Sequence, residues 1–379
     1  MKAKRIEKVL VTGGAGFIGS HTVDLLIEKG YGVTIIDNLE YQVHEGKIPE
    51  YLNKKATFIK GDLRDRELIK EIIKDMDAII HLASAVGVGQ SMYQIEKYIN
   101  YNTYGTSLLL DALVNEENNV KKLAVASSMS IYGEGKYYCE KCNENKFPEI
   151  RSIEQLEKKI WEPLCSECEN PLKPLPTDED KPLIPTSIYA MSKRHQEEMC
   201  LLIGKTYGLP VVALRYFNVY GPRQALSNPY TGVCAIFLSR ILNNKPPYIF
   251  EDGNQTRDFV HVKDVAKANL LALEKNSANY SKINIGTGKP ISIKEIANLL
   301  IEIYGINIKP YISHRYRKGD IRHCFADINK AKKLLEYEPS ISLKEGLIEL
   351  TQWAKEHKWG AIDLFEKALK ELEEKKLAT

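Results

Sequence analysis

A glycine-rich stretch near the start of the chain constrains the fold more than any other feature. The β-prone run Lys8–Thr12 leads into Gly13-Gly14-Ala15-Gly16-Phe17-Ile18-Gly19, and apolar residues then recur at helical spacing up to Ile27. This order predicts a strand, a tight turn and a helix. Glycines let the backbone approach a pyrophosphate, which would lie at the helix N-terminus, where free N–H groups favour anions. The spacing is G-x-x-G-x-x-G rather than G-x-G-x-x-G, and alone it is weak evidence.

The next predicted strand, Gly32–Asp37, ends in a carboxylate about 20 residues past the glycines. At that place a carboxylate accepts hydrogen bonds from a ribose diol and would repel a 2′-phosphate. No arginine follows directly, since the next residues are Asn38 and Leu39. The pattern therefore favours NAD over NADP. The alternative is that Asp37 only caps a turn.

Three more apolar runs, at 56–60, 78–83 and 122–127, alternate with helical stretches. Strands that are apolar on both faces and alternate with helices predict a parallel, doubly wound sheet of the Rossmann type, an α/β fold. Ligands bind such a sheet at the carboxyl ends of its strands. The hydroxyl cluster Ser127–Gly133 follows the last of these runs, so we expect it beside a substrate.

Tyr189 and Lys193 stand four residues apart in a stretch that is predicted to be helical. Residues at that spacing share one face, so the ammonium can lie beside the phenol. A phenol with a pKa near 10 is a poor base at neutral pH, but a neighbouring cation, helped by a cationic cofactor, favours the phenolate. Such pairs also occur by chance on surface helices, so this one gains meaning only from the other motifs.

The β-α rhythm breaks between residues 134 and 176, where two Cys-x-x-Cys pairs stand among charged residues and prolines. Cys139, Cys142, Cys165 and Cys168 have the spacing of a zinc ribbon, so we predict a structural zinc site. Free thiols or a pair of disulfides are the alternatives. A catalytic zinc is disfavoured, because four cysteines leave no open coordination position.

Composition and charge indicate which class of protein the chain belongs to and which partners it is expected to lack. The 379 residues are 44% hydrophobic, enough for about two domains, and the formal net charge is only +3 with both signs interspersed. No nucleic-acid or acidic-membrane partner is expected from such a charge pattern. The basic start Met1–Arg5 lacks the features of a signal peptide, and no run approaches the about 18 apolar residues of a membrane span. Seven cysteines in this pattern suit a reducing compartment, so we expect a cytoplasmic protein.

In their order, these motifs resemble the extended short-chain dehydrogenase/reductases, and within them the NAD-dependent nucleotide-sugar 4-epimerases and dehydratases. The resemblance runs from Gly13 to about Pro339 and also rests on the segments 61–63, 81–83, 215–223, 256–259 and 317–320. It implies a Rossmann NAD-binding domain at 1–133 and 177–216, a four-cysteine, zinc-ribbon-like insertion at 134–176, and a smaller substrate-binding α/β region at 217–379. The last region is expected to return one strand or helix to the Rossmann sheet.

The resemblance also implies the chemistry. Tyr189 would take the O4 proton of the sugar, Lys193 would hold the nicotinamide ribose, and Ser128 would hydrogen-bond O4, while hydride passes between C4 and NAD. The cofactor would be contacted by Gly13, Gly16, Phe17, Ile18, Gly19, Asp37, Asn38, Asp62, Leu63, Leu82, Ala83, Asn102, Ser127, Tyr189, Lys193 and Tyr216.

The two residues after Ser128 separate the possible reactions. The 4,6-dehydratases of this family carry Asp and Glu there, and decarboxylating members keep a Glu at the second place. This chain has Met129 and Ser130, neither of which supplies a carboxylate acid or base. Elimination is therefore disfavoured and epimerisation remains.

The resemblance assigns substrate contacts as well. Arg257 and Arg317 would clamp the diphosphate, although either can instead be a surface ion-pair arginine. Asn218 would bind the phosphate or sugar and Asp320 the nucleotide ribose. Cys324 falls where a small residue leaves room for an N-acetyl group at C2, unless it is simply a buried hydrophobe. The full expected set is Ser128, Ser130, Val86, Asn218, Tyr248, Phe250, Arg257, Arg317, Asp320 and Cys324.

We therefore expect an isomerase that inverts C4 of a UDP-hexose or UDP-N-acetylhexosamine and forms a homodimer through a helix pair that includes the Tyr189 helix. Val86 stands where typical UDP-galactose 4-epimerases have Lys, and the cysteine insertion resembles that of dTDP-L-rhamnose 4-epimerases. A dTDP-L-rhamnose 4-epimerase, a dehydratase or keto-reductase, and a non-catalytic NAD-binding regulator are the alternatives. The charged, amphipathic stretch from Ile362 to Lys376 is expected to be a solvated terminal helix.

Overall fold

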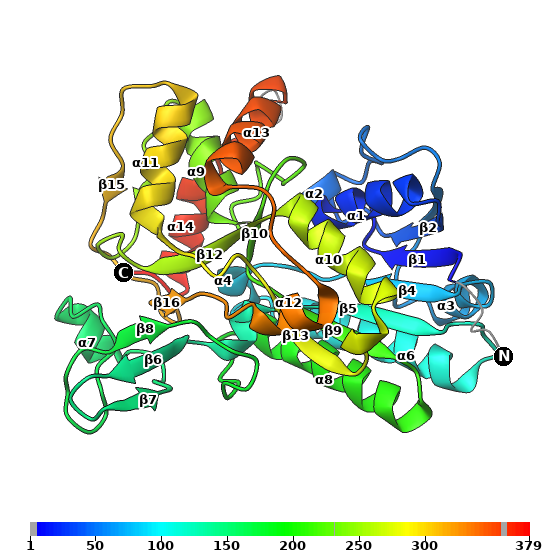
Figure 1. Cartoon of the computed structure of the whole chain (residues 1–379). Coiled ribbons are helices and arrows are strands. Elements are labelled where there is room, and N and C mark those ends of the chain that lie inside the picture. Colours follow the sequence, from blue (N-terminus) through cyan, green and yellow to red (C-terminus); the bar gives the residue numbers. More distant parts are fainter. Residues whose placement is uncertain (1–5, 231, 358–361) are drawn as a thin grey trace.

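A seven-stranded parallel sheet forms the centre of the molecule (Figure 1). The computed structural model describes residues 6–230, 232–357 and 362–379, so the basic start Met1–Arg5 lies outside it. The strands stand in the order β13-β9-β5-β4-β1-β2-β3, and each neighbouring pair is parallel. The predicted Rossmann sheet is confirmed. Its strands are β1 (Lys8–Thr12), β2 (Gly32–Asp37), β3 (Thr57–Lys60), β4 (Ala78–His81), β5 (Lys122–Ser128), β9 (Val211–Tyr216) and β13 (Ser281–Ile285).

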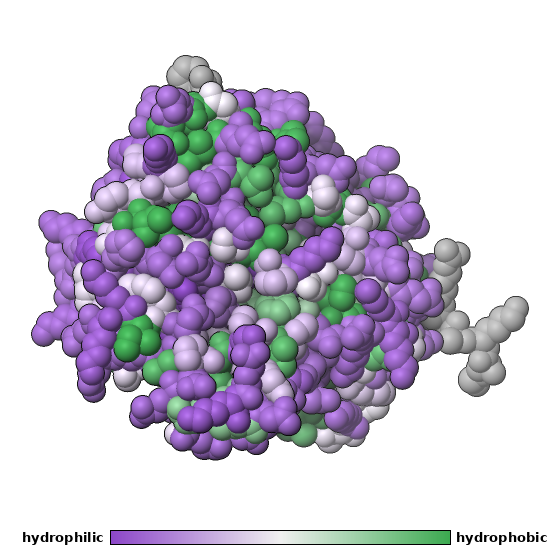
Figure 2. Space-filling model, turned by 60° about the vertical axis from the view of Figure 1, so that its left-hand side comes forward, coloured by the Kyte–Doolittle hydropathy of each residue, from purple (hydrophilic) through white to green (hydrophobic). Residues whose placement is uncertain are grey.

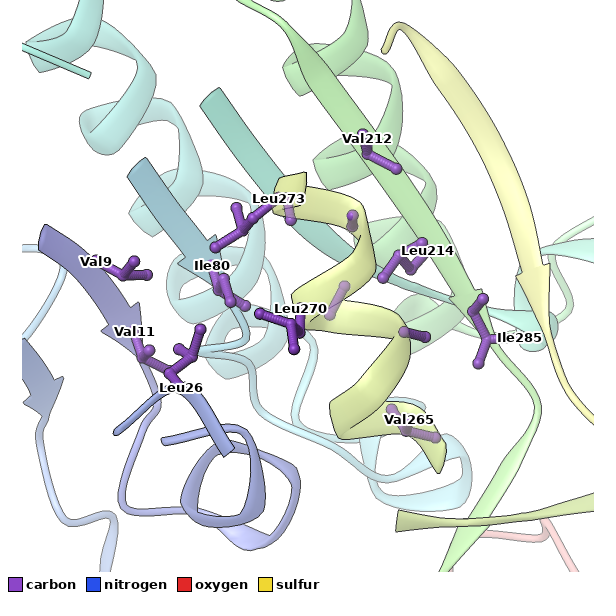
Figure 3. Packing of buried hydrophobic residues seen from close by; sticks show 14 of the residues in the cluster. Val9, Val11, Leu26, Ile80, Val212, Leu214, Val265, Leu270, Leu273 and Ile285 are labelled. Atoms are coloured by element: carbon purple, nitrogen blue, oxygen red, sulfur yellow. The ribbon is translucent and has the colours of Figure 1, made fainter. Parts of the chain in front are cut away.

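Helices cover both faces of this sheet because side chains alternate along each strand. One face packs against α1 (Phe17–Glu28), α10 (Val262–Glu274) and α12 (Asn329–Leu335), and the other against α3 (Arg66–Ile73), α6 (Gly105–Asn115) and α8 (Ile188–Tyr207). Figure 3 shows Leu270 and Leu273 of α10 on the side of the helix toward Ile80 of β4, and Leu214 of β9 belongs to the same buried cluster. Leu10, next to Val9 and Val11 of the first face, belongs to the opposite core.

Short elements connect the larger ones near the ends of the strands. They are α2 (Tyr41–His44), α4 (Val88–Ser91), α5 (Ile95–Tyr98), a π-helical turn at Ile99–Tyr104, and 3-10 turns at Met129–Tyr132 and Asn276–Ala278. The π-helical turn runs directly into α6, so 95–115 is nearly continuous helix.

The second region packs four helices around two small sheets. Its helices are α9 (Val233–Leu242), α11 (Ile293–Tyr304), α13 (Leu343–Glu356) and α14 (Phe365–Glu374). Its strands are β10 (Asn218–Tyr220), β11 (Tyr248–Ile249), β12 (Thr256–His261), β14 (Pro290–Ser292), β15 (Tyr311–Ile312) and β16 (His323–Cys324). Capping boxes begin α11 at Ser292/Glu295 and α13 at Ser342/Glu345, which explains where these helices start. The strand β13 and the helices α10 and α12 of the same stretch belong to the Rossmann layer.

Residues 134–176, called the ribbon below, form a lobe beside β16 (Figure 1). An antiparallel sheet in the order β7-β6-β8 makes its body, and a short helix follows β7. Its elements are β6 (Lys136–Cys139), β7 (Glu144–Lys146), α7 (Ile153–Glu157) and β8 (Lys173–Leu175). Buried Tyr137 and Leu172 pack with the cysteines as a small core of their own.

The C-terminal helix departs from expectation. The helix α14 exists, but it is not merely solvated, because Ala368 and Leu372 are buried. Its Glu371 accepts hydrogen bonds from the hydroxyls of Tyr230 (2.5 Å) and Tyr93 (3.1 Å). An amphipathic pattern predicts the helix but not what its apolar face contacts.

Polar residues cover most of the face shown in Figure 2, with apolar residues in smaller groups between them. Over the described ranges, no helix has the length and apolar character needed to cross a membrane.

Candidate active site

The glycine turn connects β1 to α1 at the carboxyl end of the sheet. Gly13 adopts a φ of +69° and donates its N–H to the carbonyl of Ile36 at 2.8 Å, which ties the turn to β2. A Cβ on Gly19 would lie 2.7 Å from the Cα of Gly14 and closer still to the Gly13 carbonyl oxygen. The turn therefore requires glycine for its own packing, and it presents the N-terminus of a 12-residue helix toward the cavity.

Two carboxylates lie beside this turn. Asp37 ends β2, and its oxygens accept from the N–H groups of Ala15 (3.1 Å) and Leu39 (2.9 Å). Asp62 accepts from Asn38 (2.9 Å) and from two nitrogens of Arg64 (2.8 and 2.7 Å). Burial raises the pKa of Asp62, but the hydrogen bonds from Arg64 and Asn38 outweigh it, so the pKa falls to about 2. Both groups thus have fixed orientations at the wall where a nucleoside would lie.

Tyr189 and Ser128 meet across the cavity. The helix α8 begins one residue before Tyr189, because the Ser187 side chain caps it by accepting from the N–H of Ala190 at 3.1 Å. Ser128 accepts from the hydroxyl of Ser130 at 2.9 Å, which leaves its own proton for the Tyr189 phenol. Burial raises the pKa of Tyr189, and the hydrogen bond with Ser128 partly offsets this. The lowering that we expect from Lys193 and a cationic cofactor stays a prediction.

Gln196, one helical turn after Lys193, holds the lysine side chain. Its Nζ donates to Oε1 of Gln196 at 2.8 Å, and burial lowers its pKa to about 7. Nε2 of Gln196 donates to the hydroxyl of Thr106 at 2.7 Å and lies 3.2 Å from Nε2 of His81. The Lys193 ammonium is therefore positioned by a buried amide that spans α8 and α6.

His81 completes this network as a neutral ring. The Thr106 hydroxyl donates to the carbonyl of Asn102 (2.6 Å), so it must accept from Nε2 of His81 (2.9 Å). The Thr12 hydroxyl then donates to Nδ1 at 2.8 Å. Burial lowers the pKa of His81 to about 3, which agrees with a ring that acts as structural donor and acceptor rather than as an acid.

A cavity of about 480 Å³ joins these groups, a size that suits a small-molecule ligand. Two buried polar atoms in its wall, Oγ of Ser127 and Oδ1 of Asn218, have no hydrogen-bond partner among the residues that the structure describes. Unpaired polar atoms in a concave wall indicate groups that a ligand satisfies. The predicted residues that line it are Gly13, Gly16, Phe17, Ile18, Gly19, Asp37, Asn38, Asp62, Leu63, Leu82, Ala83, Val86, Ser127, Ser128, Ser130, Tyr189, Lys193, Tyr216 and Asn218. A second cavity, of about 660 Å³ between α1, α10 and α13, lies away from the glycine turn.

Seven predicted residues are not at this wall: Asn102, Tyr248, Phe250, Arg257, Arg317, Asp320 and Cys324. Asn102 binds the backbone of Ala85 through both its amide groups, so it orients the loop after β4. Arg257 donates to the carbonyls of Thr256, Ile321 and Arg322 at 2.7–2.9 Å.

The other members of this group also have partners within the chain. Arg317 pairs with Asp320 at 2.7 Å and stacks on Phe250. Cys324 is buried with its thiol 3.8 Å from the Thr177 hydroxyl. Their contacts with substrate stay predictions.

The sequence reasoning missed Arg64 and Gln196. Gln196 stands three residues after Lys193, so helical spacing was the available signal. The Arg64 guanidinium also lies over the ring of Tyr101, 4.0 Å from its centre, and Tyr101 lines the cavity. No local pattern singles out an arginine two residues past Asp62.

The four ribbon cysteines converge. Their sulfur atoms all lie within 4.8 Å of one another, with Cys139 and Cys168 at 3.5 Å and Cys142 and Cys165 at 3.7 Å. None of the seven cysteines, all of which lie in the described residues, forms a disulfide.

One cavity thus joins the glycine turn, the Asp37 carboxylate and the Tyr189/Ser128 pair. A family model matches the part of the chain that carries these groups. The model for the NAD dependent epimerase/dehydratase family matches residues 9–153 and 163–286. The chain belongs to this family. It is therefore an NAD-dependent enzyme of the epimerase type, an isomerase.

Named relatives are similar over nearly their whole length. The dTDP-L-rhamnose 4-epimerase of Burkholderia thailandensis is 34% identical, over 92% of this chain and 94% of its own. A Thermotoga maritima UDP-glucose 4-epimerase solved with UDP-glucose is also 34% identical, with a TM-score of 0.76, covering 93% of this chain and 99% of its own. A Methanobrevibacter ruminantium UDP-N-acetylglucosamine 4-epimerase solved with UDP-N-acetylmuramic acid has the same values.

Proposed function

We propose that this protein inverts C4 of a UDP-hexose or a UDP-N-acetylhexosamine through a 4-keto intermediate, with tightly bound NAD. One observation carries the proposal: the Ser130–Ser128–Tyr189 hydroxyl chain lines the same cavity as the glycine turn, and positions 129 and 130 hold no carboxylate. The similarity to epimerases solved with UDP-glucose and UDP-N-acetylmuramic acid supports the uridine nucleotide.

Each side chain at the site has a separate role in the proposed reaction. When bound, NAD supplies the acceptor that takes a hydride from C4 and returns it. Tyr189 accepts the O4 proton as a phenolate, directly or through the Ser128 hydroxyl, and gives it back when the keto group is reduced. Lys193, held by Gln196, places its ammonium near the phenol and favours the phenolate. Met129 and Ser130 offer no acid for a leaving hydroxyl at C6, so the sugar retains all its oxygens.

The binding groups fit NAD. The Gly13–Gly19 turn presents the N-terminus of α1 at the cavity, where free N–H groups suit a pyrophosphate, and the Asp37 carboxylate at the end of β2 suits a ribose diol. Oγ of Ser127, in the cavity wall, has no hydrogen-bond partner among the described residues and would be available to the cofactor. Phe17, Ile18, Leu82 and Ala83 supply apolar wall.

The experiment combines cofactor content with a substrate panel. We expect purified protein to carry NAD and to interconvert UDP-glucose with UDP-galactose, or the N-acetyl pair, without added cofactor, as followed by ¹H NMR. No turnover of these sugars, of UDP-glucuronate or of dTDP-L-rhamnose would overturn the proposal and favour an NAD-binding regulator. Turnover of dTDP-L-rhamnose alone would establish the second candidate, the activity for which the 34% identical Burkholderia relative is named.

We also propose that Cys139, Cys142, Cys165 and Cys168 hold a structural zinc ion. Two thiolates at about 2.3 Å from a tetrahedral ion lie about 3.8 Å apart, close to the 3.5 and 3.7 Å between the sulfurs here, whereas a disulfide requires about 2.05 Å. Four thiolates leave no position for substrate. Metal analysis should find one zinc per chain, and Cys165→Ser should remove most of it. A wild-type content below half an equivalent would refute the site.

We also propose that the protein is a homodimer and that it is cytoplasmic. Met191, Leu202 and Tyr207 expose apolar surface along α8 and suit a helix pair between two copies, so light scattering should give twice 43.1 kDa. Leu202→Asp should then yield a monomer, and a wild-type monomer would contradict the pairing. Seven cysteines without a disulfide suit a reducing compartment, so we place the protein in the cytoplasm.

A further inference from the structure

A buried set of charges joins the ribbon to the segment Arg317–Cys324. Within the described ranges it consists of Glu134, Arg151, Glu162, Glu251, Asp252, Arg322 and His323, and we call it the support network. Glu134, Arg151 and Glu162 belong to the ribbon, whereas the other four belong to the substrate-binding region. The Arg151, Arg322, Glu134 and Glu251 side chains are no more than 3% exposed. The mechanism proposed above uses none of these groups.

Arg151 is the ribbon's main contact. Its two terminal nitrogens donate to the two oxygens of Glu251 at 3.0 and 2.9 Å, a paired geometry that orients both side chains. The same nitrogens donate to the carbonyl of Trp161 within the ribbon and to the carbonyl of Asp320, each at 2.9 Å. One guanidinium thus binds the ribbon, the loop after β11 and the backbone of the segment 317–324.

Arg322 and His323 also attach the segment 317–324 to the ribbon and to the loop after β11. The Arg322 guanidinium donates to Glu251, Asp252 and Glu162 at 2.7–3.0 Å, and the His323 ring contacts Glu162 at 2.9 Å. The backbone is held as well. The N–H of Arg322 donates to Glu134 at 2.7 Å, and the N–H of Gly135 donates to the carbonyl of His323 at 2.9 Å.

This segment carries the groups that are expected to bind the nucleotide. Arg317 pairs with Asp320 within it, and the Arg257 guanidinium is oriented by the carbonyls of Ile321 and Arg322. Any displacement of residues 320–322 therefore moves Arg257 and Asp320 together. Glu197–Arg215, a buried pair that stays within the Rossmann layer, has no comparable link to the segment.

We propose that the ribbon positions the nucleotide-binding segment, with Arg151 as the positioning residue that transmits its fold. Substrate binding then depends on a folded ribbon, whereas binding of NAD does not. This inference rests on the proposed function for its substrate. The ribbon acts as a support for recognition and supplies no group to the reaction at C4.

The test compares Arg151→Met with wild type, Arg151→Lys as the conservative rescue, and Lys173→Met as the control. Lys173 forms an ion pair with Glu140 on the ribbon's exposed surface, so its loss changes ribbon charge without touching the network. Each purified full-length chain is assayed for zinc, NAD, kcat and KM, and for hydrogen exchange by mass spectrometry.

We expect Arg151→Met to keep NAD and zinc, to raise KM about tenfold, and to leave kcat within about threefold, because the catalytic hydroxyls are untouched. Exchange in the peptide covering residues 317–327 should accelerate about tenfold, while the peptide covering 8–37 stays unchanged. Arg151→Lys should restore part of the KM, and Lys173→Met should match wild type. If Arg151→Met does not fold, Glu162→Gln, whose side chain is 38% exposed, is the second variant, with the same expected direction.

Unchanged exchange at 317–327, or a KM within about twofold of wild type, would overturn the proposal. A proportional loss of kcat and NAD would also overturn it, since that result indicates general destabilisation. Failure of the proposed function can be told apart from failure of this inference. If the proposed function is wrong, the wild type shows no turnover, but hydrogen exchange is measured without substrate and still tests whether the ribbon holds the segment 317–324.

Discussion

Gly19→Ala places a methyl group at the tightest point of the glycine turn. The added Cβ would lie 2.7 Å from the Cα of Gly14, about 1 Å inside an ordinary carbon–carbon contact. The obstructing atoms belong to the backbone, so no side chain can rotate away, and overpacking of this kind costs about 3 kcal/mol. Alanine in the first turn of α1 recovers about 1 kcal/mol of helix propensity. The net expected loss is about 2 kcal/mol of unfolding free energy.

Urea unfolding of Gly19→Ala beside Gly32→Ala tests this reasoning. Gly32 is a matched control, because a Cβ there would meet its nearest atom, the Glu7 carbonyl oxygen, only at 3.6 Å. We expect the control to stay within about 0.5 kcal/mol of wild type and to retain co-purified NAD. Gly19→Ala should lose NAD as well, since the displaced atoms form the turn that would cradle the pyrophosphate. Stability equal to wild type with full NAD content would refute the assignment of this turn.

Further predictions concern the site, the charges and the metal. Ser128→Ala should lower kcat roughly a hundredfold with NAD content unchanged, whereas a loss below about threefold would argue against the hydroxyl chain. Burial lowers the pKa of Lys122 to about 8, so between about pH 8 and 10 the unfolded chain binds more protons and the unfolding free energy rises with pH. Lys122→Met should flatten that rise relative to wild type in urea titrations, and an unchanged slope would count against the burial of the ammonium. Chelation of the proposed zinc ion should lower the melting temperature of the protein, and a melting curve unaffected by chelator would show that the ribbon folds without a metal.

The sequence predicts those parts of the fold that local periodicity encodes. The glycine turn, the carboxylate at the end of β2 and the Tyr189/Lys193 face all follow from spacings of 2 and 3.6 residues, and the Rossmann sheet is as expected. The cysteine spacing likewise predicts the convergence of four sulfurs in the ribbon.

The sequence does not predict which side chains that are distant along the chain form ion pairs or hydrogen bonds with each other. Arg151 and Glu251 are 100 residues apart, and Arg257 uses carbonyls 64 and 65 residues away. A guanidinium can donate to a diphosphate, a carboxylate or a backbone carbonyl, and the packing of three chain segments decides which acceptor is near. The burial of one face of α14 was missed for the same reason, since an amphipathic pattern does not name what covers it.

The central claim, that Tyr189 exchanges the O4 proton, is tested most directly by Tyr189→Phe. The phenylalanine ring keeps the edge-on contact with Tyr98 and removes only the hydroxyl, so the variant should fold and carry NAD like wild type. Turnover of the nucleotide sugar, followed by NMR, should fall about a thousandfold. Activity within about tenfold of wild type would contradict the mechanism.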